Sequence, residues 1–595
     1  MNMIIGASFG GVASLTATSG PGLSLMMEGL GLAVMSETPV TVVDVMRGGP
    51  STGIPTKSEQ SDLNIALYGM HGDAPHLVLA PLSIVDCVFT TQWAVQLAEH
   101  LQTVSLVLAD QSLGQSRAVV SPPAAVELGL SRRVETRPAD DYLRYQVSET
   151  GISPMTLPGT PDGMYTADGL EHNRQGTPSS MAVDHREQLA KRAQKLAEFD
   201  FGEAWAEIRG SGPRCIITWG SSNGAVLDTV RRLEEQGEVL RVIALRLLMP
   251  LQSAAFASGP KGGGADSGVG AEPLRPALSL SAGRGGSCRT LPTHWPSLGP
   301  CRCGQDGSCA HWMRSVDREA EMSVPALKAK DYKSAIKPVW CPGCGDFAVL
   351  AALTRALAHL RLPKHQVALV SGIGCSSRLP AYLDSYGFHG VHGRALALAS
   401  GLKAARPDLT VIAAGGDGDG FSIGGNHFLH ACRRNMDITY IVMDNEVYGM
   451  TKGQASPTTR PDWLSSKMTP HGTGIPSFQP AAIALAAGAG FIARGYSGDP
   501  AELTRLFVEA IQHRGFAFVQ VLSSCVTFRP EQREWKQQVH PFDGVPVDDP
   551  VEAARIIQAD DGRSTGLIYK GELPVWQLEN QVMSALARLE EEFLV

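Results

Sequence analysis

Three aspartates and an asparagine follow neighbouring apolar runs of the sequence. The run 410–416 leads into Asp417 and Asp419, which are interleaved with glycines, and the run 438–443 is followed by Asp444 and Asn445. A segment of helical length separates the two runs, a pattern that indicates a βαβ unit of a parallel sheet. Because ligands bind beyond the carboxyl ends of such strands, we expect both polar ends to face one site.

Spacing excludes two of the three phosphate or metal motifs that this loop could form. A dinucleotide fingerprint requires a third glycine three residues after the second, where this chain has Phe421 or Ile423. A calcium loop that starts at Asp417 requires glycine at its sixth position and glutamate at its twelfth. The chain has Ser422 and Phe428 there.

The remaining motif is a diphosphate held through Mg²⁺. Asp417 and the Asn445 amide oxygen are hard ligands of the kind that Mg²⁺ prefers. The surrounding glycines are Gly416, Gly418 and Gly420. Because glycine has no side chain, they allow the backbone to approach the phosphates closely. The alternative is a glycine-rich turn that carries two solvated acids.

Four cysteines form a second candidate group. Cys341 and Cys344 make a C-x-x-C motif in "KPVWCPGCGDF", whereas Cys375 and Cys525 each follow an expected strand. One close pair with two distant single thiols favours a [4Fe–4S] cluster, because zinc is more often held by two close pairs. Zinc, a thioredoxin-like dithiol and purely structural cysteines remain alternatives.

Length and charge limit the kind of protein that carries these groups. A chain of 595 residues is too long for one hydrophobic core, and its net charge of −8 argues against nucleic acid as a partner. No apolar run is long enough to span a bilayer, and no basic region precedes the apolar residues at the start. We therefore expect a cytoplasmic enzyme that makes no membrane contact.

Strand and helix signals alternate on both sides of one irregular segment. In the N-terminal third, strands are expected at "TPVTVVDV", "HLVLAP" and "VSLVLAD", and a β, α, β pattern begins at Arg214. Residues 253–322 are rich in Gly, Pro, Ser and Arg without periodicity, so we expect a disordered linker. After the linker, four expected strands end at Cys375, Asp417, Asn445 and Cys525.

Five motifs after the linker closely resemble the β subunit of 2-oxoacid:ferredoxin oxidoreductases, especially the 2-oxoglutarate type. They are "WCPGCGDF", "SGIGCSSRLP", "HGRALALASG", "GGDGDGFSIGGNH" and "MDNEVYGMTKGQASPT". The N-terminal "TATSGPGLSLMMEGLGLA", "MRGGPSTGIPTKSEQSDL" and "PGTPDGMYTADGLEHNRQG" resemble the thiamine-pyrimidine domain of the α subunit. The chain is therefore similar to a fusion of two normally separate subunits.

The resemblance implies a thiamine-diphosphate-binding α/β fold. This fold has two parallel-sheet, three-layer domains, of the pyrimidine and diphosphate types, here with a partial third α/β domain. We expect a partial pyrimidine-type domain over 1–190, a fragment of a second α-subunit-like domain over 210–252 and the linker over 253–322. The diphosphate- and iron–sulfur-binding domain is expected over 323–595.

The implied activity is the oxidative decarboxylation of a 2-oxoacid, with 2-oxoglutarate expected. The family uses thiamine diphosphate, Mg²⁺ and a [4Fe–4S] cluster, and it converts a 2-oxoacid, CoA and oxidised ferredoxin to acyl-CoA, CO₂ and reduced ferredoxin. A homodimer or an assembly with a further subunit is expected. The alternatives are a non-redox thiamine diphosphate decarboxylase and an inactive or partner-dependent pseudoenzyme from a truncated gene.

The resemblance also implies roles for individual residues. Asp417, Asn445 and the Val447 carbonyl correspond to Mg²⁺ ligands, and Cys341, Cys344, Cys375 and Cys525 correspond to cluster ligands. The other residues expected to contact the cofactor are Gly416, Gly418, Asp419, Gly420, Tyr448, His392 and Arg394.

Three basic residues are expected to act on the substrates. Arg47, in "MRGGPSTG", matches the arginine expected to bind the 2-oxoacid carboxylate, a task that suits a bidentate guanidinium. Lys452 and Arg378 are candidates for a second carboxylate or for the phosphates of CoA. Lys452 is the residue that favours 2-oxoglutarate.

The chain departs from the family pattern at its start. The family's α subunit carries a substrate loop and a glutamate for the aminopyrimidine, and both should lie ahead of Met1. We expect Glu28 to be a structural helix residue rather than a replacement for that glutamate. The expectation is therefore that this chain alone turns over 2-oxoacids poorly, since a positioned acid–base group contributes about 10²–10⁴-fold in rate.

Overall fold

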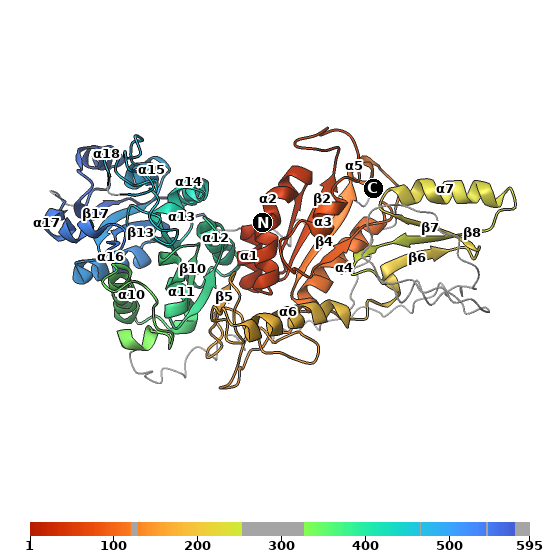
Figure 1. Cartoon of the computed structure of the whole chain (residues 1–595), viewed down its shortest axis with the longest axis horizontal. Helices are drawn as coiled ribbons and strands as arrows, with labels where there is room; N and C mark the ends of the chain where they lie inside the picture. The colour runs from red at the N-terminus through yellow and green to blue at the C-terminus, as the bar shows by residue number, and fades with distance from the viewer. Residues whose placement is uncertain (121–128, 253–326, 465, 543–545, 577–595) are drawn as a thin grey trace, which may run out of the picture.

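The computed structural model describes residues 1–120, 129–252, 327–464, 466–542 and 546–576. Within these residues the strands form three sheets, which follow one another along the long axis of the molecule (Figure 1). The expected linker 253–322 lies outside the described residues. No helix in the described part of the chain is both long and apolar enough to cross a membrane.

The middle sheet is built by the N-terminal third of the chain. Its spatial order is β1 (Leu15–Thr18), β2 (Val40–Met46), β4 (Val104–Asp110), β3 (Leu77–Leu79) and β9 (Leu247–Met249). The first four strands are parallel and contain the three expected ones, whereas β9 pairs antiparallel with β3. Helix α2 (Gly20–Met35) packs on one face and α4 (Asp86–Leu101) on the other, giving three layers.

A buried charge cluster holds this sheet to helix α6 (Ala182–Ala197). Glu37 is fully buried and pairs with Lys191 (Nζ–Oε1 2.5 Å) and with Lys195. Burial alone would raise the pKa of Glu37, but the positive charges of Lys191, Lys195 and Arg144 outweigh it and hold the pKa well below its usual range. Burial lowers the pKa of Lys191 to about 7, although Glu37 opposes that shift.

Replacing Glu37 by glutamine should destabilise the protein strongly. The change leaves Lys191 and Lys195 buried without their carboxylate, and breaking a buried pair from one side costs about 3–5 kcal/mol in the free energy of unfolding. Chemical denaturation measures this loss. The matched control is Glu187→Gln, which removes a more exposed ion pair with Arg174 and should cost less than about 1 kcal/mol. Equal losses in the free energy of unfolding for the two variants would show that the buried charge cluster stabilises the protein no more than an exposed ion pair does.

The largest sheet is built mainly by the C-terminal half. Its spatial order is β16 (His540–Pro541), β17 (Ser564–Lys570), β14 (Phe491–Tyr496), β15 (Phe516–Leu522), β13 (Ile438–Asp444), β12 (Thr410–Gly416), β10 (Val367–Ser371), β11 (Tyr386–His389) and β5 (Thr166–Asp168). The four strands expected to end in functional residues, β10, β12, β13 and β15, are parallel neighbours. Their carboxyl ends therefore lie on one edge of the sheet. Strand β17 is antiparallel to β14, so this sheet, like the middle one, is mixed rather than purely parallel.

Helices cover both faces of the largest sheet. Helices α10 (Asp346–Leu360) and α16 (Pro500–Gln512) pack on one face. The other face is covered by α12 (Ala395–Ala405), α14 (Gly425–Arg434), α15 (Pro480–Ala486) and α18 (Pro550–Ala559). Shorter helices in the described chain include α3 (Leu63–Tyr68), α5 (Gln111–Gln115), α11 (Leu379–Tyr382), α13 (Asp417–Phe421) and α17 (Trp535–Gln538).

The N-terminal and C-terminal halves share structure rather than merely touching. Strand β5 extends the largest sheet by pairing with β11, and α1 (Asn2–Phe9) packs against α12 (Figure 1). A Cβ on Gly6 would lie 2.0 Å from the Leu398 carbonyl oxygen, and one on Gly401 would lie 1.9 Å from that of Met3. Glycine at both positions therefore permits the close approach of the two helices.

The third sheet lies at the opposite end of the molecule from the largest one (Figure 1). It contains β6 (Ala206–Arg209), β8 (Leu240–Leu245) and β7 (Arg214–Trp219), and α7 (Ser222–Glu234) packs on it. The β, α, β pattern expected from Arg214 onward is present as β7, α7 and β8.

Candidate active site

A cavity of ≈ 260 Å³ lies at the carboxyl ends of β10, β12 and β13. Its walls are the loop 373–376 after β10, residues 416–419, 422 and 423 after β12, residues 445 and 447–451 after β13, and His392. Eight of the ten predicted cofactor residues line it, namely Gly416, Asp417, Gly418, Asp419, Asn445, Val447, Tyr448 and His392. Gly420 and Arg394 do not.

The three predicted magnesium ligands lie together in this cavity. The Asn445 N–H points at Asp417 Oδ1 across 3.4 Å, and the Asn445 amide oxygen accepts a hydrogen bond of 3.0 Å from the Val447 N–H. This second bond closes a turn in which an asparagine side chain orders its own backbone. Adjacent strands, β12 and β13, thus bring Asp417 and Asn445 to one point.

A threonine hydroxyl joins two buried carboxyl groups at this point. Thr458 Oγ1 lies 2.8 Å from Asp417 Oδ2 and 2.8 Å from Asp444 Oδ1. A hydroxyl has one proton to donate, so Thr458 can fully satisfy only one of the two carboxyl groups as a donor. Burial raises the pKa of Asp417 to about 8, and the Asp444 carboxylate adds to the shift. Such a desolvated acid pair fits a divalent cation, whose charge would compensate the ionised carboxylate.

Asp419 joins two segments of the cavity wall through hydrogen bonds. Its Oδ1 accepts hydrogen bonds from the N–H of Ile373 (3.0 Å) and of Gly393 (2.7 Å), and its buried Oδ2 has no protein partner. Burial raises the pKa of Asp419 to about 6, while the two N–H donors oppose the shift. Asp419 therefore holds the loops after β10 and β11 against the glycine-rich segment.

The C-x-x-C motif is a tight turn at the start of α10. The Cys344 N–H donates to the Cys341 carbonyl (3.0 Å), and the Gly345 N–H donates to the Ser524 carbonyl (3.1 Å), next to Cys525. A Cβ on Gly345 would lie 2.5 Å from Ser523 Oγ. Only glycine at this position allows the motif to approach the end of β15 so closely.

Two of the four predicted cluster thiols, Cys375 and Cys525, lie beside the cavity-lining Gly449. A Cβ built on Gly449, a cavity-lining residue, would lie 3.8 Å from Cys525 Sγ and 4.0 Å from Cys375 Sγ. Burial raises the pKa of Cys375 to about 11, with negative charge on Asp346, Cys525 and Cys341 adding to it.

The same environment surrounds Cys344. Burial raises its pKa well above the usual range, and charge on Asp346, Cys525 and Cys375 adds to the shift. Among the described residues, no group of three or more His, Cys, Asp or Glu side chains is placed so that it could hold a metal ion.

Similarity to known proteins agrees with this site. Residues 1–192 match the family described as pyruvate flavodoxin/ferredoxin oxidoreductase, thiamine diP-bdg, and residues 366–521 match the thiamine pyrophosphate enzyme, C-terminal TPP binding domain. The chain is 41% identical over 247 residues to 2-oxoacid:ferredoxin oxidoreductase 1, subunit beta, of Aeropyrum pernix, covering 40% of this chain and 76% of that protein. The chain belongs to the 2-oxoacid:ferredoxin oxidoreductase family.

Other relatives in this family include 2-oxoglutarate oxidoreductase subunit KorB of Mycobacterium tuberculosis, which is 47% identical over 201 residues, or 34% of this chain. This chain covers 54% of that protein, so it spans about half the length of that relative. Among solved structures, a 2-oxoglutarate:ferredoxin oxidoreductase from Magnetococcus marinus is 41% identical. The match covers 46% of this chain and 94% of that one, with a TM-score of 0.42.

The three basic residues that the oxidoreductase family suggested as catalytic do not line the cavity. Arg47 is half-buried at the end of β2, where its Nη2 donates to the Thr52 carbonyl (3.0 Å). Lys452 is exposed in the turn that follows Gly449, at φ +80°. Arg378 lies near Cys375, where its charge opposes the rise in the pKa of that thiol.

The N-terminal half of the chain meets the cavity through Glu28. Its Oε1 lies 3.1 Å from Nδ1 of His392, which lines the cavity, and both side chains are substantially exposed. Arg394 instead contacts His427, with 3.2 Å between Nη1 and Nε2. The sequence placed Glu28 on a helix, as found, without indicating this contact with the cavity wall.

Sequence reasoning missed several residues that hold the site together. Thr458 reaches the two carboxyl groups from a loop 41 positions after Asp417. Gln532 is fully buried and contacts both Cys525 and Asn445, and Glu446 is buried between two arginines. The family motif "MDNEVYGMTKGQASPT" contains Glu446 and Thr458 but did not indicate their contacts, and no spacing rule marked Gln532.

Proposed function

We propose that this protein carries out the oxidative decarboxylation of a 2-oxoacid, with CoA as acyl acceptor and ferredoxin as electron acceptor. The preferred substrate that we propose is 2-oxoglutarate. The observation that carries the proposal is the position of the Cys375 and Cys525 thiols beside a diphosphate-type cavity, with Cys341 and Cys344 near enough to influence their charge. A decarboxylase that exports no electrons has no need of such a thiol group.

Two sets of residues would hold the cofactors. Asp417, the Asn445 amide oxygen and the Val447 carbonyl would bind Mg²⁺, and the backbone of the glycine-rich segment would approach the diphosphate. Cys341, Cys344, Cys375 and Cys525 would hold a [4Fe–4S] cluster. When bound, thiamine diphosphate stabilises the negative charge that remains after CO₂ leaves, and the cluster accepts electrons one at a time.

The residues of the chain supply position and electrostatics for this chemistry. Thr458 holds the Asp417 carboxylate in place from behind the cavity, and Asp419 fixes the loops on either side of it. His392 and Glu28 mark the edge at which the N-terminal half reaches the cavity. We propose that a substrate enters here.

We propose that three basic side chains determine the choice of substrate. The relative from Mycobacterium tuberculosis is named for 2-oxoglutarate, which carries a second carboxylate. Lys452 is exposed beside the cavity-lining Thr451 and would pair with that group, while Arg378 or Arg47 would bind the carboxylate next to the keto group. Arginine suits the second task because it binds carboxylates in a bidentate manner.

An anaerobic assay tests the proposal. Protein reconstituted with iron, sulfide, thiamine diphosphate and Mg²⁺ should reduce methyl viologen or ferredoxin when given 2-oxoglutarate and CoA, with two electrons transferred for each CO₂ released. Succinyl-CoA should form in step with the electrons. The rate with pyruvate should be lower than the rate with 2-oxoglutarate. Lys452→Met should reduce the ratio of these two rates, whereas the control Lys467→Met should leave the ratio unchanged.

The rival activity has a different outcome in the same assay. Release of CO₂ that requires no CoA and reduces no acceptor would identify a non-redox decarboxylase and contradict the proposal. Cofactor and cluster binding without any CO₂ release or electron transfer, in the presence of each substrate, would identify a pseudoenzyme.

A further inference from the structure

Gln532 is a buried side chain that contacts both halves of the candidate site. It lies on the short helix Pro530–Glu534, and none of its surface is exposed. Its Oε1 accepts a hydrogen bond of 2.7 Å from the Cys525 N–H, and its Nε2 donates one of 2.7 Å to the Asn445 carbonyl. The N–H can only donate and the carbonyl can only accept, so the orientation of the amide is fixed by its partners.

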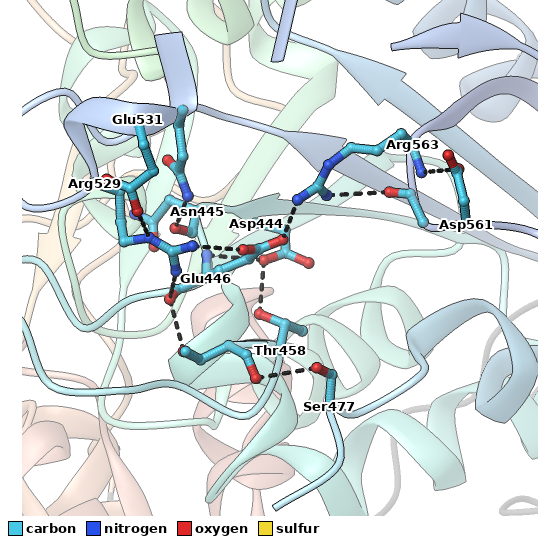
Figure 2. A network of polar contacts seen from close by, with 12 residues as sticks. Asp444, Asn445, Glu446, Thr458, Ser477, Arg529, Glu531, Asp561 and Arg563 are labelled. Atoms are coloured by element: carbon cyan, nitrogen blue, oxygen red, sulfur yellow. Dashed lines mark hydrogen bonds and ion pairs between the residues drawn. The ribbon is translucent and has the colours of Figure 1, made fainter. Parts of the chain in front are cut away.

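A second contact joins the same two loops. Arg529 donates from Nη1 to the Glu446 carbonyl (2.9 Å) and pairs through Nη2 with Glu446 Oε2 (3.1 Å). Arg563 holds the other carboxylate oxygen at 3.0 Å, so Glu446 lies between two arginines (Figure 2). The Arg529 N–H in turn donates to the Cys525 carbonyl (2.9 Å).

The backbone at Glu446 depends on these contacts. Its φ is +55°, a left-handed conformation that a glutamate rarely adopts and that surrounding contacts must hold in place. The residues on either side of it are Asn445 and Val447, the proposed magnesium ligands. We call residues 445–447 the diphosphate-binding loop and residues 525–532 the cluster-binding loop. Through these contacts, each of the two loops holds the other in place.

We propose that Gln532 is a positioning residue that couples the cluster-binding loop to the diphosphate-binding loop. This inference rests on the proposed function, because it takes Cys525 as a cluster ligand and Asn445 as a magnesium ligand. Ordering one loop orders the other through this amide, which acts beside the Arg529 contact, so each group binds more tightly when the other is present. Coupling between two sites is reciprocal and typically changes affinity about 5–150-fold.

The test measures this coupling rather than activity. Calorimetry under anaerobic conditions gives the dissociation constant of thiamine diphosphate with Mg²⁺ for the full chain before and after cluster reconstitution. Wild-type protein should bind at least about fivefold more tightly with the cluster. As the reciprocal readout, thiamine diphosphate should slow the loss of visible cluster absorption to an iron chelator by a similar factor.

Two variants remove the coupling in different ways. Gln532→Glu keeps an acceptor for the Cys525 N–H and loses the donor to the Asn445 carbonyl, and Gln532→Met loses both. Each should bring the two dissociation constants to within about twofold of one another while far-UV circular dichroism stays unchanged. The matched control is Gln188→Met, which removes another fully buried glutamine that donates to a carbonyl, that of Tyr145. That variant should keep the wild-type coupling.

The outcomes separate this inference from the proposed function. If the wild-type chain binds neither thiamine diphosphate nor a cluster, the proposed function itself is wrong. If it binds both but the coupling is absent, or survives in the folded Gln532→Glu protein, the role of Gln532 is wrong and the proposed function stands. If the Gln532→Met protein fails to fold, the Gln532→Glu protein alone decides whether Gln532 carries the coupling.

Discussion

Replacing Cys344 by alanine should prevent the protein from binding the proposed iron–sulfur cluster. Cys344 is half-buried beside Cys375 and Cys525, and burial together with the charge of these neighbours raises its pKa. Thiolates this close together are stable only with a cation to compensate them. Without one of the four ligands we expect iron content and broad visible absorption, measured after anaerobic reconstitution, to fall to the level of unreconstituted protein.

The control for this variant is Cys87→Ala. Cys87 is also a half-buried free cysteine, and its thiol donates to the Ser83 carbonyl far from the cavity. It should keep wild-type iron content and absorption. If Cys344→Ala retained the full complement of iron, Cys344 would not be a ligand and the set of four would have to be redrawn.

Replacing Asp417 by asparagine should weaken the binding of thiamine diphosphate with Mg²⁺ by at least about 100-fold, since even indirect partners of metal ligands contribute 10–100-fold. The side chain keeps its size but loses the charge that a hard cation requires. The apoprotein should be no less stable than wild type. Asp417 is buried next to Asp444, and burial makes its charged form costly in the absence of metal.

Calorimetry measures this loss directly, and Asp408→Asn is its control. This control makes the same replacement at an exposed carboxylate, because Asp408 is exposed and pairs with Arg406. Its cofactor affinity should equal that of wild type. A dissociation constant for Asp417→Asn within about threefold of wild type would show that Mg²⁺ is held elsewhere, because a lost first ligand costs far more.

The sheet that carries the site could be predicted because strand order follows from simple rules. Apolar runs ending in Cys375, Asp417, Asn445 and Cys525 indicated parallel strands, and such strands gather their ends on one edge. The structure places the four strands as neighbours. Hydrophobic periodicity gave no comparable signal for β5, which has three residues and joins a sheet whose other strands lie more than 190 positions later.

The residues that support the site could not be predicted in the same way. Gln532 and Asn445 are 87 positions apart, and Glu446 and Arg563 are 117 apart. Such contacts depend on how loops pack, which leaves no pattern in a single sequence. Helix α6 shows the same limit. Its lysines and arginines suggest a solvated face, yet Lys191 and Lys195 are buried because Glu37, more than 150 positions earlier, compensates them.

Residues assigned by family resemblance alone divide in a similar way. His392 and Tyr448 line the cavity, whereas Arg47, Lys452 and Arg378 lie outside its wall. The first two sit in segments next to strand ends, where the parallel sheet dictates their position. Arg47 follows a strand of another sheet, Arg378 ends the short helix Ser376–Arg378, and Lys452 lies in an exposed turn, so resemblance gave each a role but no geometry.

The central claim is that thiamine diphosphate with Mg²⁺ and a [4Fe–4S] cluster bind side by side at one edge of one sheet. Native mass spectrometry of anaerobically reconstituted protein tests it most directly. We expect the wild-type chain to carry both groups, Cys344→Ala to lose the cluster but keep weakened diphosphate binding, and Asp417→Asn to lose the diphosphate but keep the cluster. A wild-type chain that carries a single zinc ion in place of iron, or no thiamine diphosphate at saturating concentration, would contradict the claim.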